Sequence, residues 1–245
     1  MRLAPQLHRI GNDIVAAYLV ETADGITLID AGLPGHWRDL LRELRAMGRE
    51  LSDIRGVILT HGDSDHLGFA ERLRSEHGVP VYIHAADAER AKGGSKPPTP
   101  MGRKRLGALV GFFAYAARKG GARTRHLTEV IEIEDGQVLP FPGDPQIVAL
   151  PGHSPGSIAV HVPAVRAAFV GDALTTRSVL TGEVGPQPAP FTDEPAEALA
   201  SLDRLSGLDV EWILPGHGAP WRGRPTDAVA AVRAAASASL PGFAG

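Results

Sequence analysis

The sequence predicts an α+β fold in which two mixed β-sheets pack face to face and helices cover their outer sides. Segments with the apolar patterns of strands outnumber the helical segments, and they form one cluster before residue 84 and another after residue 129. Each cluster is flanked by stretches with apolar residues every three to four positions, the spacing of amphipathic helices. Elements of these two kinds bury their apolar faces by stacking in layers.

The first cluster begins with a predicted hairpin, in which strands at 14–20 and 26–29 flank a turn at 23–25. A surface helix is expected next, because apolar residues recur with helical spacing over 36–47. After it we expect a strand that ends at Leu59, a loop, a helix that ends before Gly78 and a strand at 79–83.

Residues 93–126 form a predicted insertion between the two clusters. A connector rich in Gly and Pro leads into a helix with an apolar stripe, flanked by Arg103, Lys104, Arg105, Arg118, Lys119, Arg123 and Arg125. The helix is apolar on more than one face, so it needs a cover that its own domain does not supply. A lid over a site, a homodimer contact through 102–118, a membrane-surface helix and simple packing on the core are all open. For the basic flank, a solvated face is favoured over a contact to a substrate carboxylate or phosphate.

The second cluster contains predicted strands at 130–133, 138–141, 147–150, 157–162, 167–170 and 210–214. A helix is expected to open at Pro195, with acidic residues at its positive end, and to stop at Gly207. An Ala-rich helix at 226–236 follows, and the tail at 241–245 is expected to fray.

Composition is that of an ordinary globular protein, and we expect a single domain over residues 1–245. The chain has no Cys, which excludes disulfides, a thiolate nucleophile and Cys-based metal sites. A net charge of -3 gives no electrostatic footprint for nucleic acid. No signal peptide and no apolar run of bilayer length is evident, so we expect a cytoplasmic protein without stable membrane insertion.

Four side chains that can bind a metal fall within six positions directly after the strand that ends at Leu59. Residues two apart point to the same side of an extended segment, so His61 and Asp63 can share one ion. Asp65 and His66, where the chain turns into a helix, can reach a second ion. A polar loop with Asp65 as helix N-cap is the alternative, although crowded imidazoles and carboxylates are costly without a cation between them.

Three more residues of this type repeat the pattern. His153, Asp172 and His217 each follow an apolar run and are bracketed by Gly or Pro. Side chains delivered from several strand ends build one site on a rigid sheet. Other polar residues at comparable positions, such as Asp30 and His84, are assigned to structure.

Together these motifs resemble the metallo-β-lactamase superfamily. The matching segments are Leu28–Gly32, His61-x-Asp63-x-Asp65-His66, Gly152–Ser157, Gly171-Asp172 and Pro215–Gly218, from about residue 15 to residue 218. The resemblance implies a four-layer αβ/βα sandwich. It also implies two divalent metal ions, the first held by His61, Asp63 and His153, the second by Asp65, His66 and His217, with Asp172 between them.

One position departs from the family, which usually has His where this chain has Asp63. An oxygen ligand makes the first site harder and more negative, which favours manganese or iron relative to an all-nitrogen site. A third carboxylate is also expected to lower the Lewis acidity of the pair. Zinc is still the expected ion, and occupancy by a single metal stays open.

The expected activity is hydrolysis by a bridging hydroxide, which forms because two cations lower the pKa of a shared water molecule. Asp65 is expected to orient this water and to take its proton. The resemblance implies that an insertion at this point of the chain builds a substrate wall, which favours a lid formed by 93–126 with an apolar wall of Phe112, Phe113 and Tyr115. Such a wall suits an acyl group, so an ester, thioester or lactone is the expected substrate. The alternatives are a mononuclear iron dioxygenase acting on a persulfide, a phosphodiesterase or β-lactam hydrolase, and a binding module with structural metals.

Overall fold

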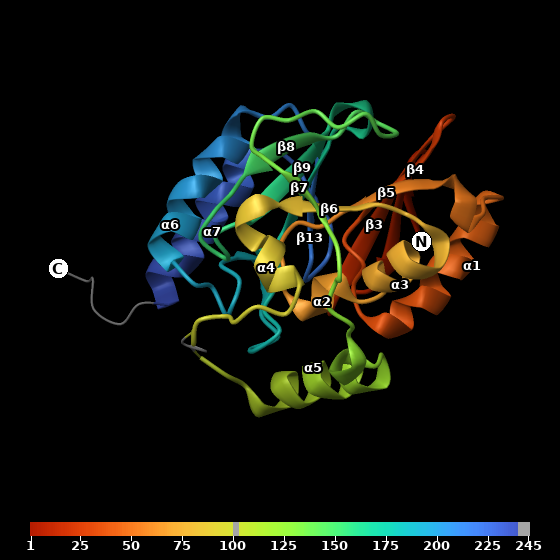
Figure 1. Cartoon of the computed structure of the whole chain (residues 1–245). Helices are drawn as coiled ribbons and strands as arrows, with labels where there is room; N and C mark the ends of the chain where they lie inside the picture. The colour runs from red at the N-terminus through yellow and green to blue at the C-terminus, as the bar shows by residue number, and fades with distance from the viewer. Residues whose placement is uncertain (100–102, 240–245) are drawn as a thin grey trace.

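Two mixed β-sheets lie face to face in the computed structural model, which describes residues 1–99 and 103–239. Figure 1 shows helices on the outer side of each sheet, so the chain forms the expected four-layer α+β sandwich. The tail at 241–245 and the first residue of the 102–118 segment lie outside the described residues.

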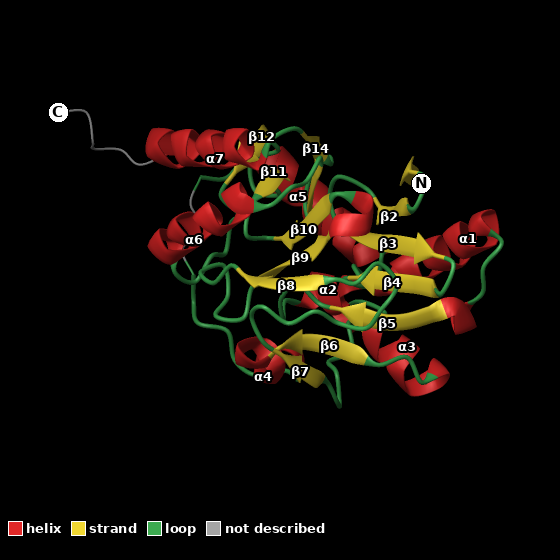
Figure 2. Ribbon diagram, turned by 90° about the horizontal axis from the view of Figure 1, so that it is seen from above, coloured by secondary structure: helices red, strands yellow, loops and turns green. Residues whose placement is uncertain are grey.

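The first sheet contains seven strands in the order of the sequence, and Figure 2 shows β2 to β7 side by side in that order. Strands β1 to β4 pair antiparallel, whereas β4 to β7 pair parallel. The strands are β1 (Arg2–Ala4), β2 (Leu7–Gly11), β3 (Ala16–Thr22), β4 (Gly25–Ile29), β5 (Ile54–Ile58), β6 (Val81–His84) and β7 (Ile131–Ile133).

The second sheet has five strands in the order β14-β13-β10-β9-β8. Both β8 and β10 are antiparallel to β9, and β10 is parallel to β13, so β8, β10 and β13 end at the same edge. The strands are β8 (Gln146–Ala149), β9 (Ile158–Val162), β10 (Ala167–Gly171), β13 (Trp212–Pro215) and β14 (Trp221–Arg222), and a separate pair consists of β11 (Thr175–Arg177) and β12 (Val184–Gln187).

Four helices cover the outer faces of the sheets: α1 and α3 lie against the first sheet, and α6 and α7 against the second (Figure 1). Helix α5 lies along the lower edge of Figure 1, below α2. None of the helices in the described part of the chain combines the length and apolar character needed to cross a membrane. The α-helices are α1 (Trp37–Met47), α2 (Ser64–Leu67), α3 (Ala70–His77), α4 (Ala88–Ala91), α5 (Leu106–Arg118), α6 (Pro195–Ser201) and α7 (Pro225–Ser239).

Three apolar layers hold the sandwich together. The central layer lies between the sheets, where the rings of Tyr18 and Phe169 are 5.4 Å apart. The outer layers seat residues such as Leu40 of α1 and Val229 of α7 against the two sheets. Burying a side chain of this size stabilises the fold by about 1.5–3 kcal/mol, so these layers fix where the strand ends lie.

Most predicted elements are present, and three differ. The helix predicted from Pro195 to Gly207 is an α-helix only to Ser201 and continues as a 3-10 helix over Leu202–Gly207. The predicted strand at 138–141 is wrong: only an isolated bridge between Val138 and Gln146 forms, and Pro140 has no N–H to extend a ladder. The helix predicted before Gly78 is divided into α2 and α3 at Gly68 and Phe69. Strands β1, β2, β11, β12 and β14 were not predicted.

Candidate metal centre

The site forms where strand ends from both sheets meet. His61 follows β5, His153 follows β8, Asp172 follows β10 and His217 follows β13. Because β8, β10 and β13 run in the same direction, three of these four residues emerge at one edge of the second sheet. Gly216 lets the chain after β13 pass close to His66, since a Cβ at this position would lie 2.4 Å from Cε1 of His66.

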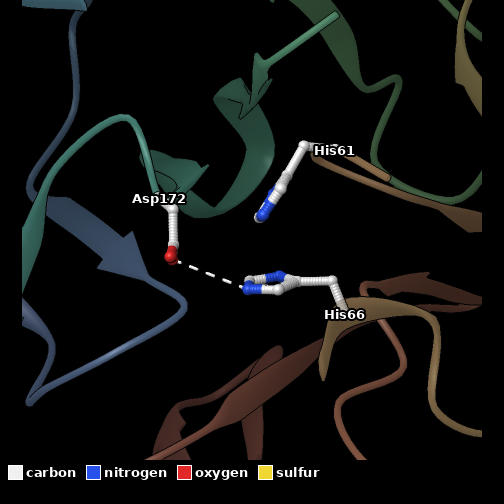
Figure 3. Close-up of side chains that lie close together, drawn as sticks. All are labelled: His61, His66 and Asp172. Atoms are coloured by element: carbon white, nitrogen blue, oxygen red, sulfur yellow. Dashed lines mark ion pairs between the residues drawn. The ribbon is translucent and has the colours of Figure 1, made fainter. Parts of the chain in front are cut away.

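All seven predicted ligand side chains converge at this edge. Their ligand-type atoms form three groups, in each of which all the atoms lie within 4.8 Å of one another. Figure 3 shows one group, in which His61 and His66 come from the stretch between β5 and the end of α2, and Asp172 follows β10. The groups are His61, His66 and Asp172; His61, Asp63 and His153; and Asp65, His66 and His217. The last two consist of the same residues as the two ligand sets that the family resemblance implies.

His61 and His66 are oriented by a buried carboxylate and a hydroxyl. Nδ1 of His66 donates to Oδ2 of Asp30 at 2.8 Å, because an ionised carboxylate can only accept. The hydroxyl of Thr60 donates to the same carboxylate at 2.9 Å and accepts from Nδ1 of His61 at 3.1 Å. In both rings, Nε2 is left to face the cluster.

The other two imidazoles are held in the same way. Nδ1 of His153 donates to the hydroxyl of Thr192 at 3.2 Å, and that hydroxyl donates onward to a backbone carbonyl. Nδ1 of His217 donates to the carbonyl of Ile14, which lies just before β3. All four rings therefore present Nε2 to one shared space.

Several of these inward-facing atoms are buried without a hydrogen-bond partner among the described residues. They are Nε2 of His61, His66 and His153, and Oδ1 of Asp172, which lies 3.6 Å from Nε2 of His66 (Figure 3). A buried polar atom without a partner costs about 1–3 kcal/mol. Four imidazole nitrogens with carboxylate oxygens are a suitable donor set for a divalent transition metal, so the residues fit the metals that the sequence implies.

Charge within the cluster is already strongly polarised. Burial lowers the pKa of His66, but the carboxylates of Asp30, Asp172 and Asp65 outweigh this effect and raise the pKa to about 9. Burial likewise lowers the pKa of His217, and Asp172 and Asp65 raise it well above its usual value. Bound cations would displace these protons, so metal binding is coupled to proton release.

Asp63, the departure from the family pattern, is held between two basic side chains. Its Oδ1 accepts from Nε of Arg90 at 2.7 Å, and its Oδ2 accepts from Nζ of Lys96 at 2.6 Å. Arg90 also pairs with Asp193 at 2.7 Å. Oδ2 of Asp63 lies 3.5 Å from Nε2 of His153, so Lys96 occupies the oxygen that faces the cluster.

The charges of Asp63, Arg90, Lys96 and Asp193 sum to zero. The group therefore adds no net charge beside the site, as a neutral His at position 63 would add none. The extra negative charge expected from Asp63 is therefore offset next to the site by Arg90 and Lys96. Burial raises the pKa of Asp63, but His153, His61 and Lys96 lower it well below its usual range. The carboxylate is thus ionised at neutral pH.

Asp87 is a further site residue that sequence reasoning missed. It is fully buried and accepts hydrogen bonds from the backbone N–H of Gly62 at 2.7 Å and of Gly156 at 2.8 Å, and from the hydroxyl of Ser154 at 2.6 Å. Asp87 thereby joins the loop that carries His61 to the loop that carries His153. It lies three residues after β6, so the search for polar residues at strand ends could have found it.

A cavity of about 650 Å³ opens beside the cluster. Its polar side includes Asp63, Asp65, His153, Asp172 and His217, and its apolar side includes Leu33, Phe112, Phe113, Val179 and Phe191. The ring of Phe112 lies 6.4 Å from the ring of His217. Among the three predicted wall residues, Phe112 and Phe113 line the cavity, whereas Tyr115 points into the body of the protein and bonds His36.

The fold and the match to a family model together define the protein as a metal-binding hydrolase. The family model described as the metallo-beta-lactamase superfamily matches residues 10–217. This match covers most of the chain, and the chain belongs to that superfamily, as its motifs predicted.

Two curated relatives support this assignment. The probable metallo-hydrolase YflN of Bacillus subtilis (strain 168) is 29% identical over 232 residues, covering 90% of this chain and 87% of the relative. The hydroxyacylglutathione hydrolase of Fuscovulum blasticum is 29% identical over 207 residues, covering 84% of this chain and 62% of the relative.

Two solved structures share the fold. The metallo-beta-lactamase family protein TTHA1429 from Thermus thermophilus superposes with a TM-score of 0.71 at 22% identity, over 97% of this chain and 81% of the other. TTHA1623 in a di-iron-bound form superposes with a TM-score of 0.59 at 30% identity, over 91% of this chain and 93% of the other.

Proposed function

We propose that two divalent cations occupy this centre and are held by His61, Asp63, Asp65, His66, His153, Asp172 and His217. The observation that supports two ions is the pair of separate triads, each with its own carboxylate and two imidazoles. Asp172 faces both triads, because its Oδ1 lies 3.6 Å from Nε2 of His66 in the second and its Oδ2 lies 3.9 Å from Nε2 of His153 in the first, so it would serve both ions. Zinc is our first choice of metal because imidazole is the commonest donor, and iron is the second.

We further propose a carboxylic thioester, ester or lactone as the substrate. The cavity supports this class most directly, since an apolar wall faces the polar cluster across a space large enough for an acyl chain. One relative is a hydroxyacylglutathione hydrolase by name, and an acyl group on a thiol is a thioester. An acyl chain would lie along Phe112 and Phe113 and bring its carbonyl group to the cluster.

Bound cations at such a centre lower the pKa of a water molecule and polarise a carbonyl oxygen. Asp65 lines the cavity, and we assign it the task of orienting the attacking water and accepting its proton at a carboxylate oxygen. Burial raises the pKa of Asp65, but its hydrogen bond to His217 and the charges of His66 and His217 keep it below its usual value. Asp65 is therefore ionised and able to accept a proton at neutral pH.

A mononuclear iron dioxygenase would need only one triad of ligands. The second triad is as complete as the first, and nothing about its burial or spacing marks it as unused. We therefore do not favour that reaction.

Metal-loaded protein tests the proposal when it is assayed with S-acyl thioesters, aryl esters and lactones of increasing acyl length. We expect hydrolysis that is lost on chelation and on Asp172→Ala, and that is retained in His77→Ala, a surface control outside the cluster. Phe112→Ala should raise KM for long acyl chains more than for short ones. If metal-loaded protein hydrolyses no member of the panel, the proposed substrate class is wrong.

A further inference from the structure

Helix α5 presents a face without any charged or polar side chain to solvent. Its exposed positions before Arg118 are 106, 107, 110, 111, 113, 114 and 117, which fall on one side of a helix and contain only Leu, Gly, Val, Phe and Ala. Leu106 is 77% exposed, and Val110 and Phe113 are each 59% exposed. A surface helix normally places polar side chains on this side, so the face requires a partner.

Basic residues lie at both ends of the helix that carries this apolar face. Residues 90–128 contain ten of the chain's 25 Lys and Arg residues and none of its 28 Asp and Glu residues. The net charge of -3 for the whole chain hides this strongly basic segment. Five of the basic side chains are exposed and have no carboxylate partner within residues 1–99 and 103–239: Arg103, Lys104, Arg118, Arg123 and Arg125.

The opposite side of α5 is anchored to the protein, so the apolar face is held outward. The hydroxyl of Tyr115 bonds Nε2 of His36 at 2.7 Å. Nζ of Lys119 pairs with Asp39 at 2.6 Å, just beyond the end of the helix. At the other end, the backbone N–H of Arg105 donates to the carbonyl of Leu180 at 3.0 Å.

We propose that α5 is a docking surface for an anionic lipid bilayer and lies in the plane of its headgroups. Apolar side chains on one face, with basic residues beside them, are the features that bind helices to such surfaces. The helix has 13 residues and is about 20 Å long, which is shorter than the hydrocarbon core, so it lies on the membrane and does not cross it.

Charge complementarity selects a bilayer over a second copy of this chain. Antiparallel pairing of two α5 helices would place Arg103 and Lys104 beside Arg118 and Arg123 of the other copy, and parallel pairing would place each basic group beside itself. Residues 90–128 offer no carboxylate to offset either arrangement. A nucleic acid would match the basic residues but would leave Leu106, Val110 and Phe113 uncovered.

Docking through this face would also place the cavity at the membrane. Phe112, Phe113 and Ala117 of α5 line the cavity, and Phe113 and Ala117 are also exposed to solvent. The centre in the cavity would therefore lie next to the bilayer surface.

Vesicle sedimentation with the metal-loaded full chain tests the proposal. The vesicles are phosphatidylcholine alone, and phosphatidylcholine with about 30 mol% phosphatidylglycerol. We expect binding to the anionic vesicles only, with loss of binding at about 0.5 M NaCl, where charges are screened over a few ångströms. Val110→Asp should weaken binding by about tenfold or more. The matched control is Val138→Asp, because Val138 is 58% exposed and lies outside α5.

Thermal unfolding of both variants shows whether each is folded. The proposal is overturned if wild-type protein fails to bind anionic vesicles, if it binds both kinds of vesicle equally, or if the two Asp variants bind alike. Light scattering distinguishes the second-copy alternative: a dimer that Val110→Asp dissociates, without vesicle binding, would assign the face to self-association.

Discussion

Replacing Asp30 with Asn perturbs the metal centre without substituting any of the proposed ligands. Asp30 is buried, and its carboxylate accepts from the N–H of Thr60 at 2.8 Å, from the hydroxyl of Thr60 at 2.9 Å and from Nδ1 of His66 at 2.8 Å. Its φ of 60° is left-handed, a conformation that Asn tolerates better than most residues. The Asp30→Asn variant therefore keeps both shape and backbone, and loses the charge and one acceptor.

The expected effect follows from the hydrogen bonds. If the amide oxygen of the introduced Asn accepts from Thr60, its NH2 group faces Nδ1 of His66, and two donors oppose each other. His66 must then give up this bond or carry its proton on Nε2, the atom that faces the centre. Loss of such an orienting partner lowers metal affinity by about 10- to 100-fold. Loss of a hydrogen bond to a charged group lowers the free energy of unfolding by about 1.5–3 kcal/mol.

Competition between the metal-free protein and a chromophoric zinc chelator measures the affinity, and chemical denaturation measures the stability. Asp144→Asn is the matched control, because Asp144 also has a positive φ of 48° but is exposed to solvent and is not part of the metal centre. The reasoning is refuted if Asp30→Asn binds zinc as tightly as the Asp144→Asn control.

Other perturbations test the clamp and the anchor of α5. Lys96→Met removes the ammonium group that competes for Oδ2 of Asp63, so affinity for the first metal should rise by about fivefold in the same competition assay, whereas a fall would show that Lys96 supports the site. Arg90→Met removes the cation that pairs with Asp193 and leaves Asp63 with Lys96 alone, so it should lower the denaturation midpoint, while an unchanged midpoint would contradict the pairing. Burial and the charge of Lys119 lower the pKa of His36 from 6.5 to about 4, so the folded state binds fewer protons than the unfolded state between these values. Stability should therefore fall by about 3 kcal/mol from pH 6.5 to pH 4, and His36→Gln should remove that part of the pH dependence in urea titrations.

The sequence predicted the positions of the clustered residues because each follows a strand that is visible as an apolar run. His153, Asp172 and His217 are far apart in the chain, yet the parallel course of β8, β10 and β13 brings their ends together. Local patterns were sufficient here, since a sheet fixes where the ends of its strands lie.

Contacts made through loops could not be predicted in the same way. Arg90 and Lys96 meet Asp63 across 27 and 33 residues, and no periodicity connects these positions. The inward direction of Tyr115 depends on His36, which lies 79 residues away. The strand predicted at 138–141 does not form because neighbouring prolines interrupt the ladder. The prolines are a local signal, but the prediction gave more weight to the apolar pattern.

Metal content measured by elemental analysis tests the central claim most directly. Protein saturated with zinc and freed of excess metal should contain two ions per chain, and His153→Ala and His217→Ala should each lose one. Wild-type protein that retains no metal, or variants that retain as much as the wild type, would contradict a two-metal centre built from these side chains.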